Sequence, residues 1–253
     1  MFDKSALQGT EQQEDRLGGN SFTLPSGVYT GTIKLAYVTP SATSKSKSVN
    51  IVIDVVRDPS NPSNTFEYRE QIWIFNGKGQ PTYEKNGKKH VLPGYEMIND
   101  MALMATGQPL DEQTVEDKTI KVWDYDAKGE VEKVLPTITS MLGKQVDLAV
   151  LEVRQNKQAK NGAGAYVDTN DERTVNEVKK FFHTPTKRTF VEVVKVNSGT
   201  TIADEDLFYT KWSEKYTGQL QDRYKPVAGA AGKTAGSGSP KTGGSSGGGS
   251  LFG

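Results

Sequence analysis

Cationic and aromatic side chains lie close together in several short segments of this chain, a combination suited to single-stranded nucleic acid. Such binding needs cations along a groove for the phosphates and aromatic faces on which unpaired bases stack. The candidate contact residues for single-stranded DNA are Lys34, Lys45, Lys47, Arg69, Trp73, Phe75, Tyr83, Lys85, Lys88, Lys89, Lys187 and Arg188. Arg69, Trp73 and Phe75 fall on one face of a predicted strand, and the lysines of residues 83–89 surround a predicted hairpin turn.

Each of these groups also has a plainer interpretation. Trp73 and Phe75 could belong to the core of a strand that is buried on both faces. Lys85, Lys88 and Lys89 could be ordinary surface charge that keeps the protein soluble. The nucleic-acid interpretation therefore depends on the coincidence of several clusters in one chain.

Motifs for catalysis and metal binding are weak in this sequence. The chain has no cysteine, which excludes disulfides and thiolate zinc sites. Residues 244–248 have the spacing of a nucleophile elbow but lie in low-complexity sequence. The two histidines, His90 and His183, are far apart in sequence, so a Ser nucleophile with a His base is the enzymatic alternative. We expect a protein that is not an enzyme and that uses no cofactor or metal.

Charge and hydropathy limit the kinds of protein that this chain can be. The 253 residues include 31 basic and 31 acidic side chains, so any nucleic-acid site must arise from local segregation of charge. No segment approaches the ~18–20 apolar residues of a membrane span, and residues 1–20 have no apolar core of a signal peptide. We expect a cytoplasmic protein that does not engage membranes.

Hydrophobic periodicity predicts a chain in which strands outnumber helices. The five principal strands are predicted at 28–38, 49–56, 65–75, 145–154 and 190–196, with hairpins at 83–89 and 119–134. Helices are predicted at 94–106, 135–142 and 204–219, and a polar loop at 155–164. In the first strand, the alternation places Tyr29, Ile33, Leu35 and Tyr37 on one side. The fold class expected is mainly β, a small five-stranded barrel with inserted hairpins and helices.

Composition divides the chain into three parts. Residues 1–20 are predicted to be a flexible N-terminal segment, 21–227 a β domain, and 228–253 a disordered Gly/Ser-rich tail. Such a tail cannot bury enough apolar surface to offset the entropy of ordering. Leu251 and Phe252 are the large apolar residues at its tip, and they are candidates for binding a partner. The alternative is an inert tail that serves solubility.

Several segments resemble bacteriophage single-stranded DNA-binding proteins of the OB-fold type. The similarity is carried by residues 66–75, 83–89 and 92–96, and by the later segments 119–125 and 142–146. It extends over roughly residues 21–224. The resemblance implies a five-stranded OB-fold barrel that binds single-stranded DNA without sequence preference, in replication, recombination or repair within the host cytoplasm.

The apolar tip of the tail also resembles the C-terminal tip of such phage proteins. Some of them activate transcription by contacting host RNA polymerase through their C-terminal ends, so replication proteins or host RNA polymerase are the partners implied for Leu251 and Phe252. Many tails of that kind are acidic, whereas this one has no Asp or Glu and carries Lys233 and Lys241. A virion or assembly protein that does not bind nucleic acid is the alternative to this function.

Overall fold

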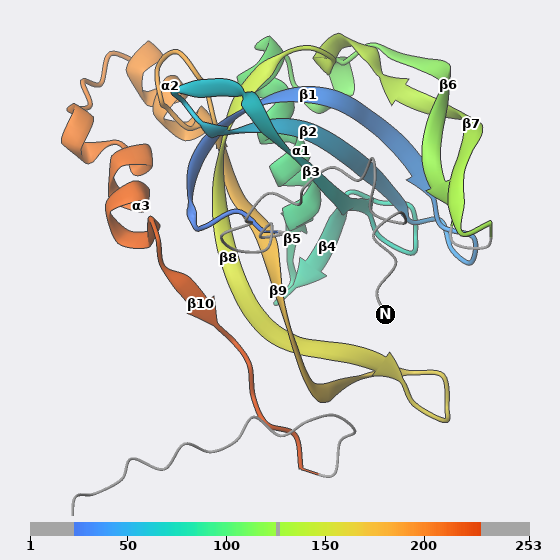
Figure 1. Cartoon of the computed structure of the whole chain (residues 1–253). Helices are drawn as coiled ribbons and strands as arrows, with labels where there is room; N and C mark the ends of the chain where they lie inside the picture. Colours follow the sequence, from blue (N-terminus) through green and yellow to red (C-terminus); the bar gives the residue numbers. More distant parts are fainter. Residues whose placement is uncertain (1–22, 125–126, 229–253) are drawn as a thin grey trace, which may run out of the picture.

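The computed structural model describes residues 23–124 and 127–228 and is mainly β (Figure 1). The N-terminal segment 1–20, nearly all of the tail, and with it Leu251 and Phe252, lie outside the described residues. In the part of the chain that is described, no helix combines the length and the apolar character needed to cross a membrane.

The elements follow one another in an order that confirms most of the predicted strands. The strands are β1 (Gly27–Pro40), β2 (Lys47–Asp58), β3 (Asn61–Phe75), β4 (Thr82–Lys85), β5 (Lys88–Val91), β6 (Val115–Asp124), β7 (Gly129–Ile138), β8 (Gln145–Lys160), β9 (Tyr166–Phe182) and β10 (Leu220–Asp222). The α-helices are α1 (Pro93–Thr106), α2 (Phe190–Asn197) and α3 (Phe208–Tyr216).

One large sheet contains every strand except the separate β4–β5 hairpin. β1, β2 and β3 form an antiparallel meander, and the other edge of β1 pairs with β8, which pairs in turn with β9. The resulting lateral order is β3-β2-β1-β8-β9, and the β6–β7 hairpin joins β1 through the pair Tyr37–Thr137. Among the described residues no ladder joins β3 to β9, so backbone pairing does not close the sheet.

Helix α1 and the Tyr68 side chain fill the space between β3 and β9. Ile98 and Met101 of α1 are fully buried in the main core beside the strands. The Tyr68 hydroxyl donates to the Glu70 carboxylate and accepts from the Val178 backbone N–H of β9 at 3.3 Å. At Gly94, an added Cβ would lie 2.2 Å from the carbonyl oxygen of Trp73, so only glycine lets the start of α1 pack this closely on β3.

The β8–β9 pair continues past the rest of the sheet as a two-stranded arm (Figure 1). The prediction of a loop at 155–164 is therefore wrong over residues 155–160, and strand β9 was not predicted. Most arm residues at 157–168 are exposed, so this part of the sequence is polar and lacks the apolar alternation that marks a strand over a core.

Two further predicted elements have a different structure. The predicted strand 190–196 is helix α2, because Thr189 and Glu192 form a capping box in which each side chain accepts a hydrogen bond from the other residue's backbone N–H. The predicted helix 135–142 is strand over residues 135–138, because β7 continues past Pro136 to Ile138 and pairs with β6 along its full length, and a short 3-10 helix follows at Thr139–Met141. This pairing overrides the helix-start signal of the proline.

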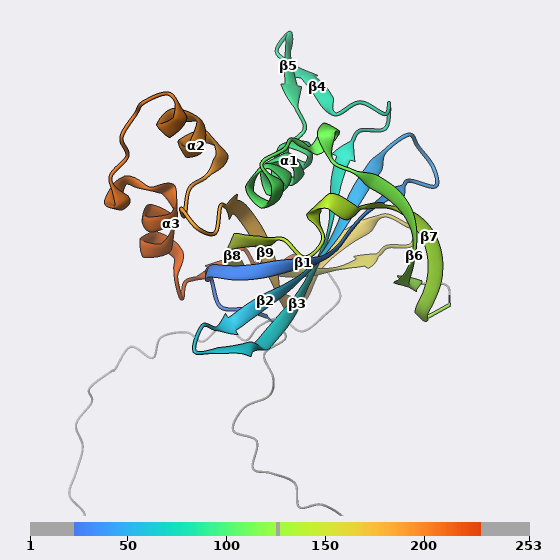
Figure 2. The ribbon, with the colours of Figure 1, turned by 90° about the horizontal axis from the view of Figure 1, so that it is seen from above.

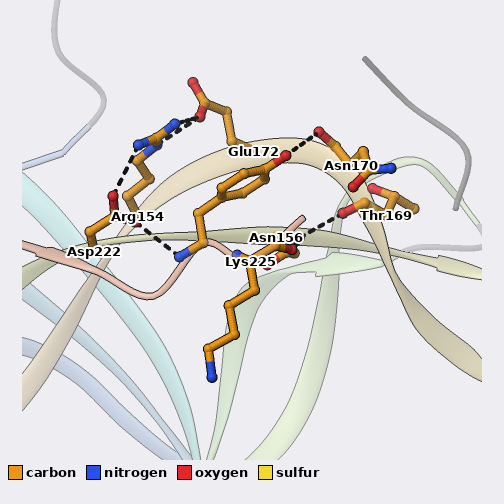
Figure 3. Close-up of polar contacts among 8 residues, drawn as sticks. Arg154, Asn156, Thr169, Asn170, Glu172, Asp222 and Lys225 are labelled. Carbon is orange, nitrogen blue, oxygen red and sulfur yellow. Dashed lines mark hydrogen bonds and ion pairs between the residues drawn. The ribbon is translucent and has the colours of Figure 1, made fainter. Parts of the chain in front are cut away.

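The last described residues run beside the β8–β9 arm and are held there by asparagine side chains (Figure 3). The Asn156 amide donates to Lys225 O at 2.7 Å and accepts from Lys225 N at 3.0 Å. Asn170 makes the same pair of bonds with Val227, at 2.9 and 2.8 Å. We call residues 222–227 the C-terminal strap, and its position sets where the tail begins.

A second, smaller core lies under α3. Trp212 packs with Leu151 and Val153 of β8 and with Phe182 of β9. Helices α2 and α3 lie at the end of the molecule opposite the β6–β7 hairpin in both views (Figures 1 and 2).

Candidate nucleic-acid interface

The face of the β1–β2–β3 meander that points away from the core presents three rows of side chains, which we call the open face. Strand register aligns one residue from each strand in every row. The rows are Leu35–Val52–Arg69, Tyr37–Asn50–Gln71 and Thr39–Ser48–Trp73. The open face therefore combines aromatic, cationic and neutral polar groups.

Hydrogen bonds between neighbouring strands fix the polar side chains of the open face. The Asn50 amide donates to the Thr39 hydroxyl at 2.7 Å, and the Gln71 amide donates to the Ser48 hydroxyl at 2.9 Å. The Ser48 hydroxyl donates in turn to Thr39 O at 3.4 Å. These bonds hold the polar side chains of the open face, which form the floor of the candidate site, in one conformation before any ligand arrives. This order lowers the entropic cost of binding.

The β6–β7 hairpin forms a wall beside this floor. Between the hairpin and the meander lies a groove of about 460 Å³, whose lining includes Tyr37, Arg69, Gln71, Trp123 and Lys133. Trp123 is 53% exposed although it is one of the largest apolar side chains of the protein. Exposed aromatic surface next to cations is the arrangement on which single-stranded nucleic acids stack.

A β-bulge determines which side of β1 enters the groove. The register of β1 against β2 shifts between Ile33 and Leu35, so Ile33 and Ala36 are both fully buried. The predicted alternation, which grouped Tyr37 with Ile33, is therefore wrong past the bulge, and Tyr37 turns to the open face. Partial burial raises the pKa of the Tyr37 phenol, so the group stays neutral and can donate a hydrogen bond at physiological pH.

Two of the predicted aromatic contacts differ in their surroundings. Trp73 is 47% exposed at the end of the third row, which excludes the core interpretation for its ring. Phe75 is half-buried, packs against the main core and meets Tyr95 edge-on with ring centroids 6.4 Å apart. Lys47 Nζ lies 5.8 Å from the Phe75 ring centroid, and Lys45 lies in the adjoining β1–β2 turn.

The cations of the open face are largely neutralised by carboxylates. Lys34 Nζ lies 2.7 Å from Glu67 and 3.4 Å from Asp54, and Arg69 pairs with the same Glu67 at 2.6 Å. The hydrogen bond from Lys34 lowers the pKa of Glu67, and the same bond raises the pKa of Lys34. Phosphates that contact Lys34 or Arg69 must therefore compete with Glu67.

The β4–β5 hairpin presents cations of a different kind. Asn86 and Gly87 have φ of 53° and 69°, as a two-residue hairpin turn requires, and the turn projects Lys85, Lys88 and Lys89. In residues 23–124 and 127–228, no ion pair joins these three lysines to a carboxylate. Tyr83 stacks on His90 in the same hairpin, with ring centroids 5.5 Å apart.

Lys187 and Arg188 do not join the groove. Neither is among the residues that line the groove, and both precede α2, which lies at the end of the molecule away from the β6–β7 hairpin (Figure 2). Lys187 Nζ is 2.5 Å from Asp147, a carboxylate that is 1% exposed, and 5.5 Å from the Tyr209 ring centroid. Its immediate role is therefore to compensate a buried charge.

Of the DNA contacts nominated from the sequence, Arg69 lines the groove. Tyr37, Trp123 and Lys133, which could stack on bases or contact phosphates there, were not nominated. Lys133 pairs with Asp124 across the hairpin at 2.7 Å. The signal for Trp123 was its place beside Lys121 in a predicted hairpin, the same aromatic–basic pattern that marked Trp73. Tyr37 could not be found by periodicity because of the bulge.

Other kinds of site have little support in the same region. Within the described residues, no group of three or more His, Asp or Glu side chains is arranged to hold a metal ion. Comparison of the sequence with protein-family models and with curated proteins finds no match. The candidate interface therefore rests on its own geometry.

Proposed function

We propose that this protein binds single-stranded DNA without sequence preference and without enzymatic activity. The observation that carries the proposal is the open face with the groove beside it. Exposed Trp73 ends the third row of the open face, whose polar side chains are held by hydrogen bonds, and the adjoining groove is lined by exposed Trp123 with Arg69 and Lys133. Stacking is insensitive to base identity because every base has a π face. Phosphate contacts likewise carry no base information.

We also propose that the sheet is an OB-fold-like barrel of five strands. The order β3-β2-β1-β8-β9, with α1 between the third and fourth of these strands along the chain, supports this assignment. The Tyr68–Val178 hydrogen bond supports it too, since it bridges the two strands that would close the barrel. OB folds bind oligonucleotides on the face of their second and third strands and with the adjoining loops, where the open face and Lys45 lie.

The resemblance to bacteriophage proteins extends this proposal to a cellular role. We place the protein in phage DNA replication, recombination or repair in the host cytoplasm. The tail would hold Leu251 and Phe252 on a tether whose r.m.s. reach is roughly 25–30 Å for ~23 flexible residues. Such a tether would raise the local concentration of a replication protein, or of host RNA polymerase, that binds the tip.

A titration of fluorescent oligonucleotides at several salt concentrations tests the function directly. We expect oligo(dT) to bind more tightly than a duplex of equal length, with log Kd rising by ~0.7 per phosphate contact for each unit of log salt. Poly-purine strands should bind with similar affinity. Equal affinity for single strand and duplex, or none for either, would favour the virion or assembly alternative.

A further inference from the structure

A second basic hollow lies under α3, away from the open face. It has a volume of about 460 Å³ and is bounded by α3, β9 and the chain just after β10. Four cations from these elements line it, namely Lys179, Lys211, Lys215 and Arg223, and no carboxylate is among its lining residues in the described part of the chain. We call it the α3 hollow.

Aromatic rings lie among these cations. Phe208 lines the α3 hollow with 45% of its surface exposed, and its ring leans on buried Phe182 at a centroid distance of 6.2 Å. Lys215 Nζ lies 5.0 Å from the Tyr216 ring centroid. The lining thus repeats the aromatic–basic chemistry of the open face. Figure 2 shows α3 at the end of the molecule away from the β6–β7 hairpin.

The cations of the α3 hollow exceed the carboxylates that pair with them. Glu177 pairs with both Lys179 and Arg223, the latter at 2.9 Å, and Asp206 pairs with Lys211 at 2.8 Å. Among the described ion pairs Lys215 has no carboxylate partner. The Asp206 hydrogen bond, with the nearby charges of Glu192 and Glu214, raises the pKa of Lys211, so this cation stays charged. A polyanion that enters the hollow is attracted by all four cations and competes with these carboxylates at Lys211.

We propose that the α3 hollow is a second contact for single-stranded DNA, reached by strands too long to be held by the open face alone. This inference rests on the proposed function. The exposed Phe208 ring favours nucleic acid over an acidic peptide, since a peptide of carboxylates would use the lysines but not an aromatic platform. Both sites lie on the outer surface of the sheet, but α3 and the β6–β7 hairpin are at opposite ends of the molecule, so the DNA must run along that surface to reach both (Figure 2).

The experiment compares two lengths of oligo(dT), about 8 and about 40 nucleotides, which lie within and beyond the span of a single OB-type site. The variant is Lys211→Ala with Lys215→Ala, and the matched control is Lys157→Ala with Lys160→Ala, which removes the same charge from the arm. For the long strand we expect the first variant to lose affinity by roughly five- to twenty-fold near 0.1 M salt and its salt slope to fall by ~1.4. The short strand should bind equally to all three proteins.

The other outcomes separate the two proposals. If the wild-type protein binds neither length, the proposed function itself fails. If it binds both and the Lys211→Ala, Lys215→Ala variant matches the control, the α3 hollow is not a DNA contact. If both lengths weaken equally, these lysines belong to the primary site and the second contact is wrong. Binding of poly-glutamate that the variant loses, with long-strand affinity unchanged, would assign the hollow to an acidic protein partner instead.

Discussion

The open face of β1–β3 and the outer face of β8–β9 belong to one sheet but differ in what covers them. On β8, Ala149, Leu151 and Val153 point outward, and α3 covers them with Trp212. On β2, the outward residues include Asn50 and Asp54, and no helix covers that face in the described part of the chain. We call the outer face of β8–β9, which α3 covers, the covered face.

This difference shows how the protein separates packing from binding. An apolar outer face must be buried, and a helix from later in the chain supplies the cover. A polar outer face needs no cover, so the aromatic rings on it remain available to a ligand. Trp212 is 5% exposed on the covered face, whereas Trp73 is 47% exposed on the open face.

The sharpest test of the comparison is Trp212→Ala. Removing this buried ring should lower the free energy of unfolding by ~3–5 kcal/mol, because the cavity left beside Leu151 and Phe182 cannot collapse fully. Urea denaturation measures the loss, and Trp123→Ala is the matched control with an exposed ring. A Trp212→Ala protein as stable as the control would show that α3 does not hold the covered face.

Trp73→Ala should show the reverse pattern. We expect affinity for oligo(dT) to fall by ~1–3 kcal/mol because a stacking face is lost. Stability should change by less than about 0.5 kcal/mol because the ring lies on the surface. Trp73→Phe should restore part of the affinity. A large loss of stability with unchanged affinity would place Trp73 with the packing residues and remove the contrast between the faces.

The sequence identified the open face better than the covered face. Alternation in β3 placed Arg69 and Trp73 on one face of the strand, apart from the apolar face that holds Ile72 and Ile74. Alternation gave the wrong face for Tyr37, because a bulge reverses the side of the sheet to which every later residue of β1 points. The hydropathy pattern carries no signal of the bulge.

Two elements at the α3 end of the molecule were predicted wrongly for different reasons: α2 has a local signal that the valine content outweighed, and β9 depends on pairing with β8. Segment 190–196 is rich in valine and reads as a strand, yet the capping box fixes it as α2. The Glu192 carboxylate also accepts from Phe208 N at 2.6 Å, which ties α2 to the start of α3. The long β9 strand was not predicted because its arm residues are polar and show no alternation. Pairing with β8 makes this segment a strand.

Asn170→Ala tests how the C-terminal strap is held along β9. The change leaves Val227 without its two hydrogen bonds to the side chain, which should cost about 1–3 kcal/mol locally. Amide exchange at Val227 should therefore speed up, while exchange in β1–β3 stays as in the wild type. Gln158→Ala, which removes an exposed hydrogen bond to Asp168 on the same arm, is the control. Unchanged exchange at Val227 would mean that other contacts secure the strap.

The smallest effect is expected at Glu70, where β3 faces β9. Burial raises the pKa of this carboxyl above its ordinary value of 4.5, with Glu177 adding to the shift and the Tyr68 hydrogen bond opposing it. The folded protein therefore holds a proton that the unfolded chain releases, so stability falls as pH rises above 4.5 and through the folded pKa. Once the pH exceeds the folded pKa, the cost of the buried charge is present in full.

Glu70→Gln removes that charge and keeps an oxygen that accepts from Tyr68. We expect the variant to be more stable than the wild type at pH 7, with the difference shrinking as pH falls toward 4.5. Glu67→Gln on the open face should behave oppositely, because its lowered pKa gives stability that is present above 4.5 and lost as pH falls below it. Thermal unfolding of both variants between about pH 2 and 7 covers both ranges. If Glu70→Gln is less stable than the wild type at pH 7, the ionised carboxylate itself helps to hold β3 next to β9.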